Sequence, residues 1–367
     1  MEREEIIEIL ADLLATEADI VPEVDTGAYR IEVSVSDPMM DQETAIYSYE
    51  IMDHEKIRVE KRANGQISGT IIKSFREIIW RCCRLERVCY VYRSEYEKWK
   101  AGNNGIDYIE TRINNDADGV SERGFSFIKN FWKEDIPYGI DSHKDKNMRN
   151  LRLLLAEYGV GKSSYCQGIR WLAAEEIKKD FLGGSAAFPF VFDLNRFRSG
   201  DFDKFIETEM YEAYKVSINY RIFEKLCQNG IFMVILDAWD QMRSAGQIHH
   251  AGQDIKQMKS LWEKRGRAVI TCRRSFYQQQ LKIKGTLSKD TGLYKLNGFD
   301  EQSAIEYIQK SGKEIQLDQG MNVSSWIKAC WKYNSDLLEK PLNLRLLVNH
   351  FDVIYKQVQH FTTFCFF

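Results

Sequence analysis

The sequence predicts an α/β fold whose centre is a doubly wound, mainly parallel sheet. Three apolar runs that lie far apart in the chain each lead directly into polar residues, and segments of helical periodicity separate them. Alternating strands and helices are typical of parallel sheets, because parallel neighbours need a crossover connection. Such sheets bind ligands at the carboxyl ends of their strands. The three runs are residues 151–155, 231–236 and 268–271.

Composition narrows the class of protein. The 367 residues predict roughly two to three domains, and 29% charged with 44% hydrophobic residues is ordinary for a globular chain. A formal net charge of −3 does not indicate a nucleic-acid partner, and no apolar run reaches the ~20 residues of a membrane span. The acidic start, MEREEIIEIL, is unlike a secretory signal. Eight cysteines without a C-x-x-C pair predict buried free thiols, so we expect a cytoplasmic protein.

Residues 1–95 predict a small separate α/β module whose role the sequence does not reveal. Apolar residues recur with a period near 3.6 in two segments and alternate in four others, while Asn64-Gly65 predicts a turn. The expected elements, in order, are helix 3–14, strands 29–35, 45–51 and 56–60, helix 71–83 and strand 88–92.

The same order of elements occurs in restriction-endonuclease-like nucleases, whose metal site combines an aspartate with an (Asp/Glu)-x-Lys string. The nearest string here is Glu60-Lys61-Arg62, which is out of step by one residue. Its carboxylate and its lysine would face opposite sides of a strand. An adaptor or recruiting module is therefore favoured over a nuclease in this segment.

Residues 96–149 predict a mixed, polar connecting region. Segments 102–105 and 114–119 are rich in Asn, Asp and Gly, which is typical of loops. Asp116 and Asp118 resemble the start of a calcium-binding loop, but the glycine and the distal glutamate lie at the wrong offsets. We expect both to be solvated turn residues. The elements expected from here on are helix 126–132, strand 187–194, helical stretches 201–228 and 253–264, and helix 301–310.

Residues 151–164, LRLLLAEYGVGKSS, predict a strand, a glycine-containing turn and the start of a helix, as a phosphate-binding loop requires. Gly159 and Gly161 let successive backbone N–H groups point at a phosphate with no Cβ in the way. Lys162 would reach the β- and γ-phosphates, and the Ser163 hydroxyl would bind Mg²⁺. The usual pattern, G-x-x-x-x-G-K-[ST], begins with glycine where this chain has Ala156, and we expect the loop to form nevertheless.

The two later runs end in residues that fit the same chemistry. Asp237 could hold Mg²⁺ through its water shell beside Ser163. Asp240 is the candidate that orients or deprotonates the attacking water, and Gln241, which positions water but is a poor base, predicts slow turnover. Arg273 could reach the γ-phosphate. Taken singly each could be a turn or surface residue, but their shared position at strand ends favours one nucleotide site.

The strings AEYGVGKSS, IFMVILDAWDQM and RAVITCRRSFY together resemble the NACHT branch of the STAND nucleotide-binding switches. The usual strings of that branch are near G-x-x-G-x-G-K-[ST], hhhhLD-(G/A)-h-D-E and hhhT-S-R, where h is apolar. AFPFVFDLNRF is similar to its second strand, YKLNGF to the strand that leads into its helical subdomain, and KPLNL to its proline-leucine signature. The resemblance covers about residues 150–350.

This resemblance implies ATP and Mg²⁺ as cofactors, slow ATP hydrolysis, and self-assembly into a homo-oligomer when an activating ligand triggers the protein. It implies a role in signalling, including bacterial defence against phage. The nucleotide-binding domain would span 150–297 and the helical subdomain 298–367, with Pro341 near the adenine. The loop residues carried over are Ala156, Glu157, Tyr158, Gly159, Val160, Gly161, Lys162, Ser163 and Ser164.

Two departures from the family pattern affect the expectation. Gln241 stands where the family has an acid, which puts the rate of hydrolysis in question. The chain ends at Phe364-Cys365-Phe366-Phe367, whereas the family continues into a winged-helix domain, whose histidine contacts the bound diphosphate, and a sensor array. We therefore expect a helical subdomain that is incomplete at its C-terminus.

Three alternatives stay open. The chain could be a scaffold that binds nucleotide without hydrolysing it, as Gln241 suggests. It could be a P-loop kinase for a small molecule, although the sequence shows no arginine-bearing lid. It could also be an effector enzyme whose activity resides in residues 1–95. The preference for ATP over GTP is not decided by the sequence.

Overall fold

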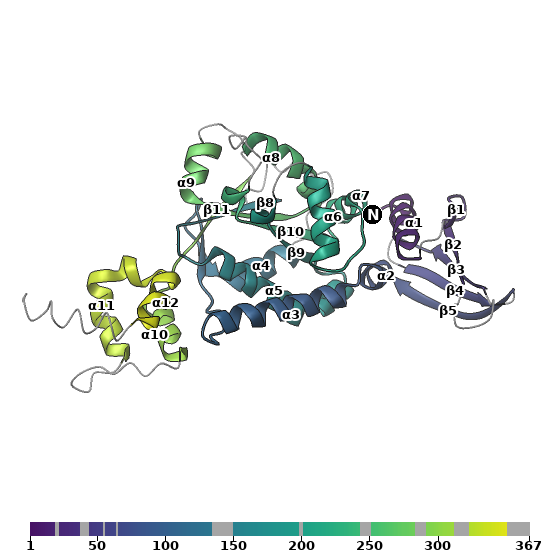
Figure 1. Cartoon of the computed structure of the whole chain (residues 1–367). Coiled ribbons are helices and arrows are strands. Elements are labelled where there is room, and N and C mark those ends of the chain that lie inside the picture. Colours follow the sequence, from purple (N-terminus) through teal and green to yellow (C-terminus); the bar gives the residue numbers. More distant parts are fainter. Residues whose placement is uncertain are drawn as a thin grey trace, which may run out of the picture.

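The computed structural model describes two sheets, of five and seven strands, and a C-terminal group of helices (Figure 1). The predicted α/β class is confirmed. The described residues are 1–18, 22–36, 44–53, 56–63, 65–133, 150–197, 201–242, 251–282, 291–311 and 323–350.

The larger sheet has the strand order β7-β6-β12-β8-β11-β10-β9. Its five strands from β12 to β9 are parallel, and β6 and β7 add an antiparallel edge. The apolar runs become the strands that are buried along almost their whole length, as parallel strands between two helical layers should be. The strands are β6 Arg112–Asn115, β7 Ser121–Arg123, β8 Leu151–Ala156, β9 Phe188–Asp193, β10 Phe232–Asp237, β11 Ala268–Arg273 and β12 Gly292–Leu296.

Helices cover both faces of this sheet, which confirms the doubly wound prediction. Figure 1 shows α3, α4 and α5 on one side and α8 and α9 on the other. Short 3₁₀ turns follow β9 and β10, at Leu194–Arg196 and Trp239–Gln241, and a π-helix spans Tyr277–Lys282. The helices are α3 Leu85–Gly102, α4 Gly124–Lys133, α5 Lys162–Leu182, α6 Phe202–Glu212, α7 Tyr220–Gln228, α8 Ala251–Met258, extended by a 3₁₀ turn at Lys259–Trp262, and α9 Arg274–Phe276.

The N-terminal module is a five-stranded antiparallel meander with α1 and α2 against it. Ile31, Val33, Ile51 and Ile57 form the buried face of the meander. Its elements are α1 Arg3–Ala18, β1 Glu23–Asp25, β2 Arg30–Ser36, β3 Thr44–Ile51, β4 Lys56–Ala63, β5 Gln66–Ser74 and α2 Phe75–Cys82.

Two predictions in this region are wrong. Residues 71–74, expected in a helix, close β5, because the capping box of Ser74 and Glu77 starts α2 only at Phe75. Residues 88–92, expected as a strand, lie inside α3. Their β-branched and aromatic side chains suggested a strand, but the buried residues of α3 follow helical spacing. These buried residues are Leu85, Val88, Cys89, Tyr92 and Tyr96.

The connecting region is more regular than expected. Asn114 and Asn115, predicted in a loop, end β6, and the tight turn that follows leads into β7. Asp118 is a turn residue, as predicted, since its carboxylate accepts hydrogen bonds from the Val120 N–H and the Asn115 side chain. The expected helix over 126–132 is confirmed as α4. α3 runs across residue 95, so the division of the chain at that residue stays a prediction.

The C-terminal helices form a separate small core beside the carboxyl ends of the strands. They are α10 Glu301–Lys310, which was predicted, α11 Val323–Leu338 and α12 Pro341–Asn349. Ile106 and Ile109, which follow α3, are buried in this core together with Phe299, Ile308 and Leu344. The connecting region therefore contacts the helical subdomain. The chain end at Phe364–Phe367 lies outside the described residues.

Candidate nucleotide site

The loop after β8 has the conformation that its glycines predict. Gly159 and Gly161 have φ angles of 81° and 104°, in the region that L side chains rarely adopt. Gly161 is the N-cap of α5, so Lys162 and Ser163 occupy its first turn. The positive end of a 21-residue helix therefore meets the loop.

Strand order brings the three polar strand ends to one edge of the sheet. β11 lies between β8 and β10, and the register pairs Arg273 with Ala156 at the end of β8. On the other side of β10, Asp237 pairs with Asp193, the last residue of β9. The residues predicted at strand ends are thus neighbours in space.

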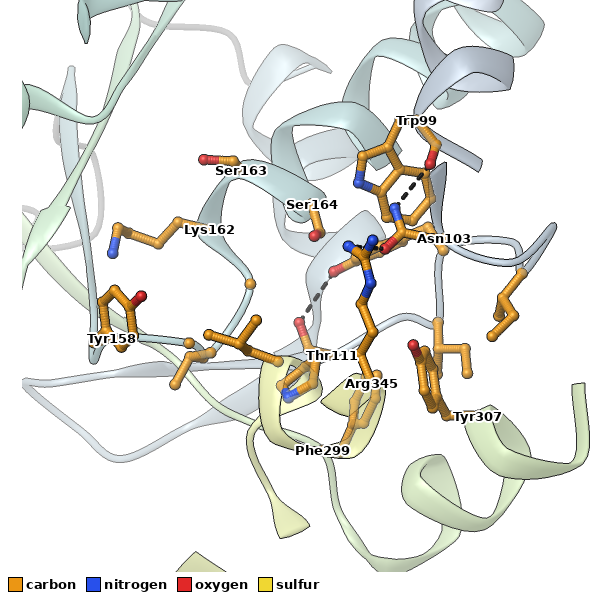
Figure 2. Close-up of a pocket in the computed structure, with 18 of the residues that line it drawn as sticks. Trp99, Asn103, Thr111, Tyr158, Lys162, Ser163, Ser164, Phe299, Tyr307 and Arg345 are labelled. Atoms are coloured by element: carbon orange, nitrogen blue, oxygen red, sulfur yellow. Dashed lines mark hydrogen bonds between the residues drawn. The ribbon is translucent and has the colours of Figure 1, made fainter. Parts of the chain in front are cut away.

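A cavity of about 360 Å³ opens at this edge and continues between the sheet and the helical subdomain. Figure 2 shows Lys162 and Tyr158 on the left of it, Trp99, Asn103 and Tyr307 on the right, and Arg345 between them. One end is therefore cationic and formed by the loop, and the other is partly aromatic. The elements that line the cavity are the loop after β8, the ends of β10 and β11, the C-terminus of α3 with residues 106–111, and the helical subdomain.

Asp237 lies directly behind the cavity. Its side chain is buried, and its Oδ1 accepts a hydrogen bond from the Thr271 hydroxyl at 2.5 Å. The same hydroxyl accepts one from the N–H of Ala238, a residue that lines the cavity. Thr271 therefore fixes the orientation of the carboxylate.

The donor set at the strand ends fits a hard divalent cation. It consists of the Ser163 hydroxyl and the carboxylates of Asp237 and Asp193, and oxygen ligands are what Mg²⁺ prefers. Burial, followed by the charge of Asp237, raises the pKa of Asp193, so a cation nearby would relieve a repulsion that already exists. Among the described residues no three His, Cys, Asp or Glu side chains form a metal cage. A cation held by these residues would take its remaining ligands from phosphates and water.

Asp240 and Arg273 are bound to each other. Asp240 accepts the Arg273 backbone N–H through Oδ1 at 3.2 Å and the Arg273 Nε through Oδ2 at 2.9 Å. The Asp240 side chain is 5% exposed and that of Arg273 is 42% exposed, with the guanidinium against the Tyr158 ring. The carboxylate is therefore occupied, while the guanidinium faces the cavity.

The helical subdomain touches the phosphate-binding loop directly. The Leu342 N–H donates to the Gly159 carbonyl at 3.3 Å. A Cβ at Gly159 would lie 3.4 Å from that of Leu342, and one at Gly161 would lie 3.8 Å from the Pro341 ring. The start of α12 therefore lies against both glycines at ordinary van der Waals distance, and it is the positive φ of the turn that requires glycine.

The far end of the cavity is closed by a contact between α12 and α3. Arg345 donates from Nη1 to the Asn103 Oδ1 at 3.0 Å and from Nη2 to the Gly102 carbonyl at 2.7 Å. Asn103 in turn donates to the Trp99 carbonyl at 2.8 Å (Figure 2). This chain of hydrogen bonds links the C-terminal helices to α3.

Most of the predicted site residues meet at the cavity. Those that line it are Tyr158, Gly159, Val160, Gly161, Lys162, Ser163, Ser164, Gln241, Arg273 and Pro341. Four lie beside it. Ala156 ends β8, and Asp237 and Asp240 are held by Thr271 and Arg273. Glu157 lines a neighbouring cavity with Gly298.

Sequence reasoning missed the aromatic half of the site. Trp99, Tyr307 and Arg345 lie on helices with no motif of their own, Asn103 caps the end of α3, and nothing in the sequence pointed to them. Asp193 could have been found, because it ends an apolar run just as Asp237 does.

Comparisons with known proteins add little to this geometry. No protein-family model matches the chain, and no curated protein is similar enough to match it. Among solved structures, a STAND protein with a tetratricopeptide repeat sensor from Pyrococcus horikoshii is 13% identical, with a TM-score of 0.29, over 59% of this chain and 30% of its own. Domain III of the replication initiation protein DnaA from Thermotoga maritima is 13% identical, with a TM-score of 0.34, over 65% and 86%. Cdc6p from Pyrobaculum aerophilum is 13% identical, with a TM-score of 0.34, over 57% and 56%. Likenesses of this degree decide nothing about function, and the chain spans less than a third of the STAND protein.

Proposed function

We propose that the chain binds a magnesium-bound nucleoside triphosphate, with ATP as the expected nucleotide. The observation that carries this proposal is one cavity lined by Lys162, Ser163, Gln241, Arg273 and Pro341. Lys162 and the N-terminus of α5 would bind the phosphates. The aromatic end, where Trp99 and Tyr307 lie, would hold the base.

Ser163 and Asp237 would hold Mg²⁺, with Asp193 close behind. When bound, the ion neutralises phosphate charge and so stabilises the leaving oxygens. Thr271 serves by keeping the Asp237 carboxylate in a single orientation.

We propose slow hydrolysis, for which Asp240, Gln241 and Arg273 are the candidate residues. Asp240 is 5% exposed and paired with Arg273, so a water would reach its carboxylate more readily once the guanidinium has moved away. A γ-phosphate that draws the Arg273 guanidinium away would free the carboxylate at the same moment. Gln241 lines the cavity and could hold the water, but it cannot take up a proton at neutral pH.

The proposed role is a nucleotide-dependent switch of the NACHT type of STAND proteins. A nucleotide in this cavity would contact the sheet and the helical subdomain together, so di- and triphosphate would favour different packing of the two. That change would control self-assembly and signalling, including defence against phage. The contacts of Leu342 and Pro341 with the loop support the proposal.

A titration of the full chain with a fluorescent ATP analogue and Mg²⁺ tests the proposal. Lys162→Ala should lose at least tenfold in affinity, since a point charge on the phosphates disappears. Lys179→Ala is the matched control, because Lys179 is an exposed lysine near the other end of the same helix. Equal affinities for the two variants would show that the loop does not bind phosphate.

A nucleotide-binding scaffold without hydrolysis is the second candidate. It is favoured by Gln241 and by the occupied carboxylate of Asp240. Release of inorganic phosphate from ATP by the purified chain separates the two functions. Phosphate release at the rate of the Lys162→Ala variant would identify the scaffold.

We also propose a reducing, cytoplasmic setting. All seven described cysteines are free, and five of them are buried. Among the described helices, none combines the length and the apolar character that a membrane span requires.

A further inference from the structure

Two adjoining cavities lie in the N-terminal module, far from the nucleotide site. Their volumes are about 590 and 460 Å³, and both are lined by Lys73 and Arg81. Figure 1 shows α2 between the meander and α3, and the cavities follow this junction. We call the joined cavities the basic groove. Its six cations are Lys61, Lys73, Arg81, Arg84, Arg87 and Lys178.

The positive charge of the basic groove is not balanced. Only two acids line it. Glu77 is engaged in the capping box of α2, and Glu86 binds Lys178 at 2.8 Å and the indole N–H of Trp80 at 3.3 Å. Apart from Lys178, the five cations of the groove form no ion pair with any residue that the structure describes. An anion entering the groove would therefore meet free donors.

Two of the cations, Lys73 and Arg81, are close enough to repel each other. Burial and then the charge of Arg81 lower the pKa of the Lys73 ammonium group. Arg84 has a φ angle of 47°, a left-handed conformation that costs a non-glycine residue about 1 kcal/mol or more. The fold thus carries backbone strain at Arg84 and repulsion between Lys73 and Arg81, and an anionic ligand would relieve the repulsion.

The groove has an aromatic and apolar floor. The β-sheet register places Tyr47 opposite Lys61 and Tyr49 opposite Val59, so these side chains share one face. Gly69 is the next residue across from Lys61, and no atom lies within 4 Å of where its Cβ would be. The floor is therefore open at this position, with a tyrosine ring and a lysine beside the gap.

We propose that the basic groove binds single-stranded nucleic acid. Cations along the walls would bind phosphates, and the tyrosine rings of the floor would stack with bases. In a duplex the faces of the bases are stacked on one another and cannot reach the tyrosine rings. An acidic peptide has no bases at all. A single strand can therefore contact both the cationic walls and the aromatic floor of the basic groove. The net charge of −3 gives no indication of this surface. The sequence gives none either, because the six cations come from six separate segments: β4, β5, α2, the turn before α3, α3 and α5.

The test is fluorescence anisotropy of labelled 12-nucleotide DNA and RNA single strands with the full chain, between 50 and 200 mM salt. Arg81→Gln/Arg87→Gln removes two exposed cations. The control, Lys98→Gln/Lys204→Gln, removes two exposed lysines outside the groove. Loss of two phosphate contacts should lower the salt slope by about 1.4, so the wild-type affinity falls about sevenfold more than that of the variant over this range.

A second variant tests the floor. Tyr47→Leu should weaken binding about tenfold without changing the salt slope, because a stacked ring carries no charge. Binding of either type of strand with these two effects supports the proposal. It is overturned if the wild type does not bind at 50 mM salt, if the arginine variant behaves like the control, or if duplex or polyglutamate competes as well as a single strand. Lys162→Ala should bind the strands normally, so the result is independent of the nucleotide site.

Discussion

The contact of Arg345 with the end of α3 makes a quantitative prediction about nucleotide affinity. Arg345→Gln removes two charge-assisted hydrogen bonds, of 3.0 and 2.7 Å, that join the helical subdomain to the aromatic end of the cavity. Such bonds contribute about 1.5–3 kcal/mol each when buried, and the side chain is half-buried, so about 2 kcal/mol in total is a reasonable value. If base binding requires this contact, affinity for ATP should fall roughly 30-fold.

Asn349→Ala is the matched control for this prediction. Asn349, the last residue of α12, accepts a neutral, exposed hydrogen bond of 3.1 Å from Asn104, just beyond α3 and outside the cavity. Its loss should change affinity less than about threefold. Isothermal titration measures the affinity for ATP, which would occupy both the cationic and the aromatic end of the cavity. A separate titration with inorganic tripolyphosphate measures binding to the cationic end alone. Tripolyphosphate should bind Arg345→Gln as it binds the wild type. Equal ATP affinity for Arg345→Gln and Asn349→Ala would refute the reasoning.

Three further predictions concern chemistry, packing and pH. Gln241→Glu should raise phosphate release several-fold and Asp240→Asn should lower it with ATP affinity largely kept, and turnover indifferent to both would remove these residues from the mechanism. Gly298→Ala should destabilise the fold by about 2 kcal/mol in thermal unfolding, because a Cβ there would lie 2.2 Å from the Glu339 carbonyl oxygen. Hydrogen bonding to Lys225 of α7 lowers the pKa of Glu8 on α1. At a pH above the pKa that Glu8 has in the unfolded chain, its carboxylate therefore stabilises the contact between the two helices. This stabilisation is lost as the pH falls through the lower pKa of the folded protein. In the Glu8→Gln variant the free energy of unfolding should therefore decrease less on acidification than in the wild type.

Two controls sharpen these measurements. Gly102→Ala places a Cβ where no atom lies within 4 Å, so its unfolding temperature should stay close to that of the wild type. Glu5→Gln changes a half-buried carboxylate on the same helix as Glu8 that forms no ion pair with a described residue, and should leave the acid transition as it is. A Gly298→Ala protein as stable as Gly102→Ala would contradict the packing argument.

The centre of the fold could be predicted from the sequence because local and global signals agree there. β8, β10 and β11 are short apolar runs ended by polar residues, and the glycines after β8 require the turn that they make. Elements that depend on distant partners were harder to predict. Residues 88–92 have strand-like composition, yet they lie in α3 because its buried side packs on α5.

The site shows the same division. Lys162, Gln241 and Arg273 follow strands and were predicted to converge. Asn103 and Arg345 are far apart in the chain, and only the docking of α12 on α3 joins them. The basic groove could not be predicted from any single stretch of the sequence, because its cations belong to several elements and the chain as a whole is slightly acidic.

Hydrogen exchange with and without magnesium and ATP tests the central claim most directly. A nucleotide in the shared cavity should slow backbone exchange at three places at once: the loop 157–164, segment 103–111 and the start of α12 at 341–345. The Lys162→Ala variant should show none of these changes. Protection of the loop alone, with the other two segments unaffected at saturating ATP, would contradict a site shared between the sheet and the helical subdomain.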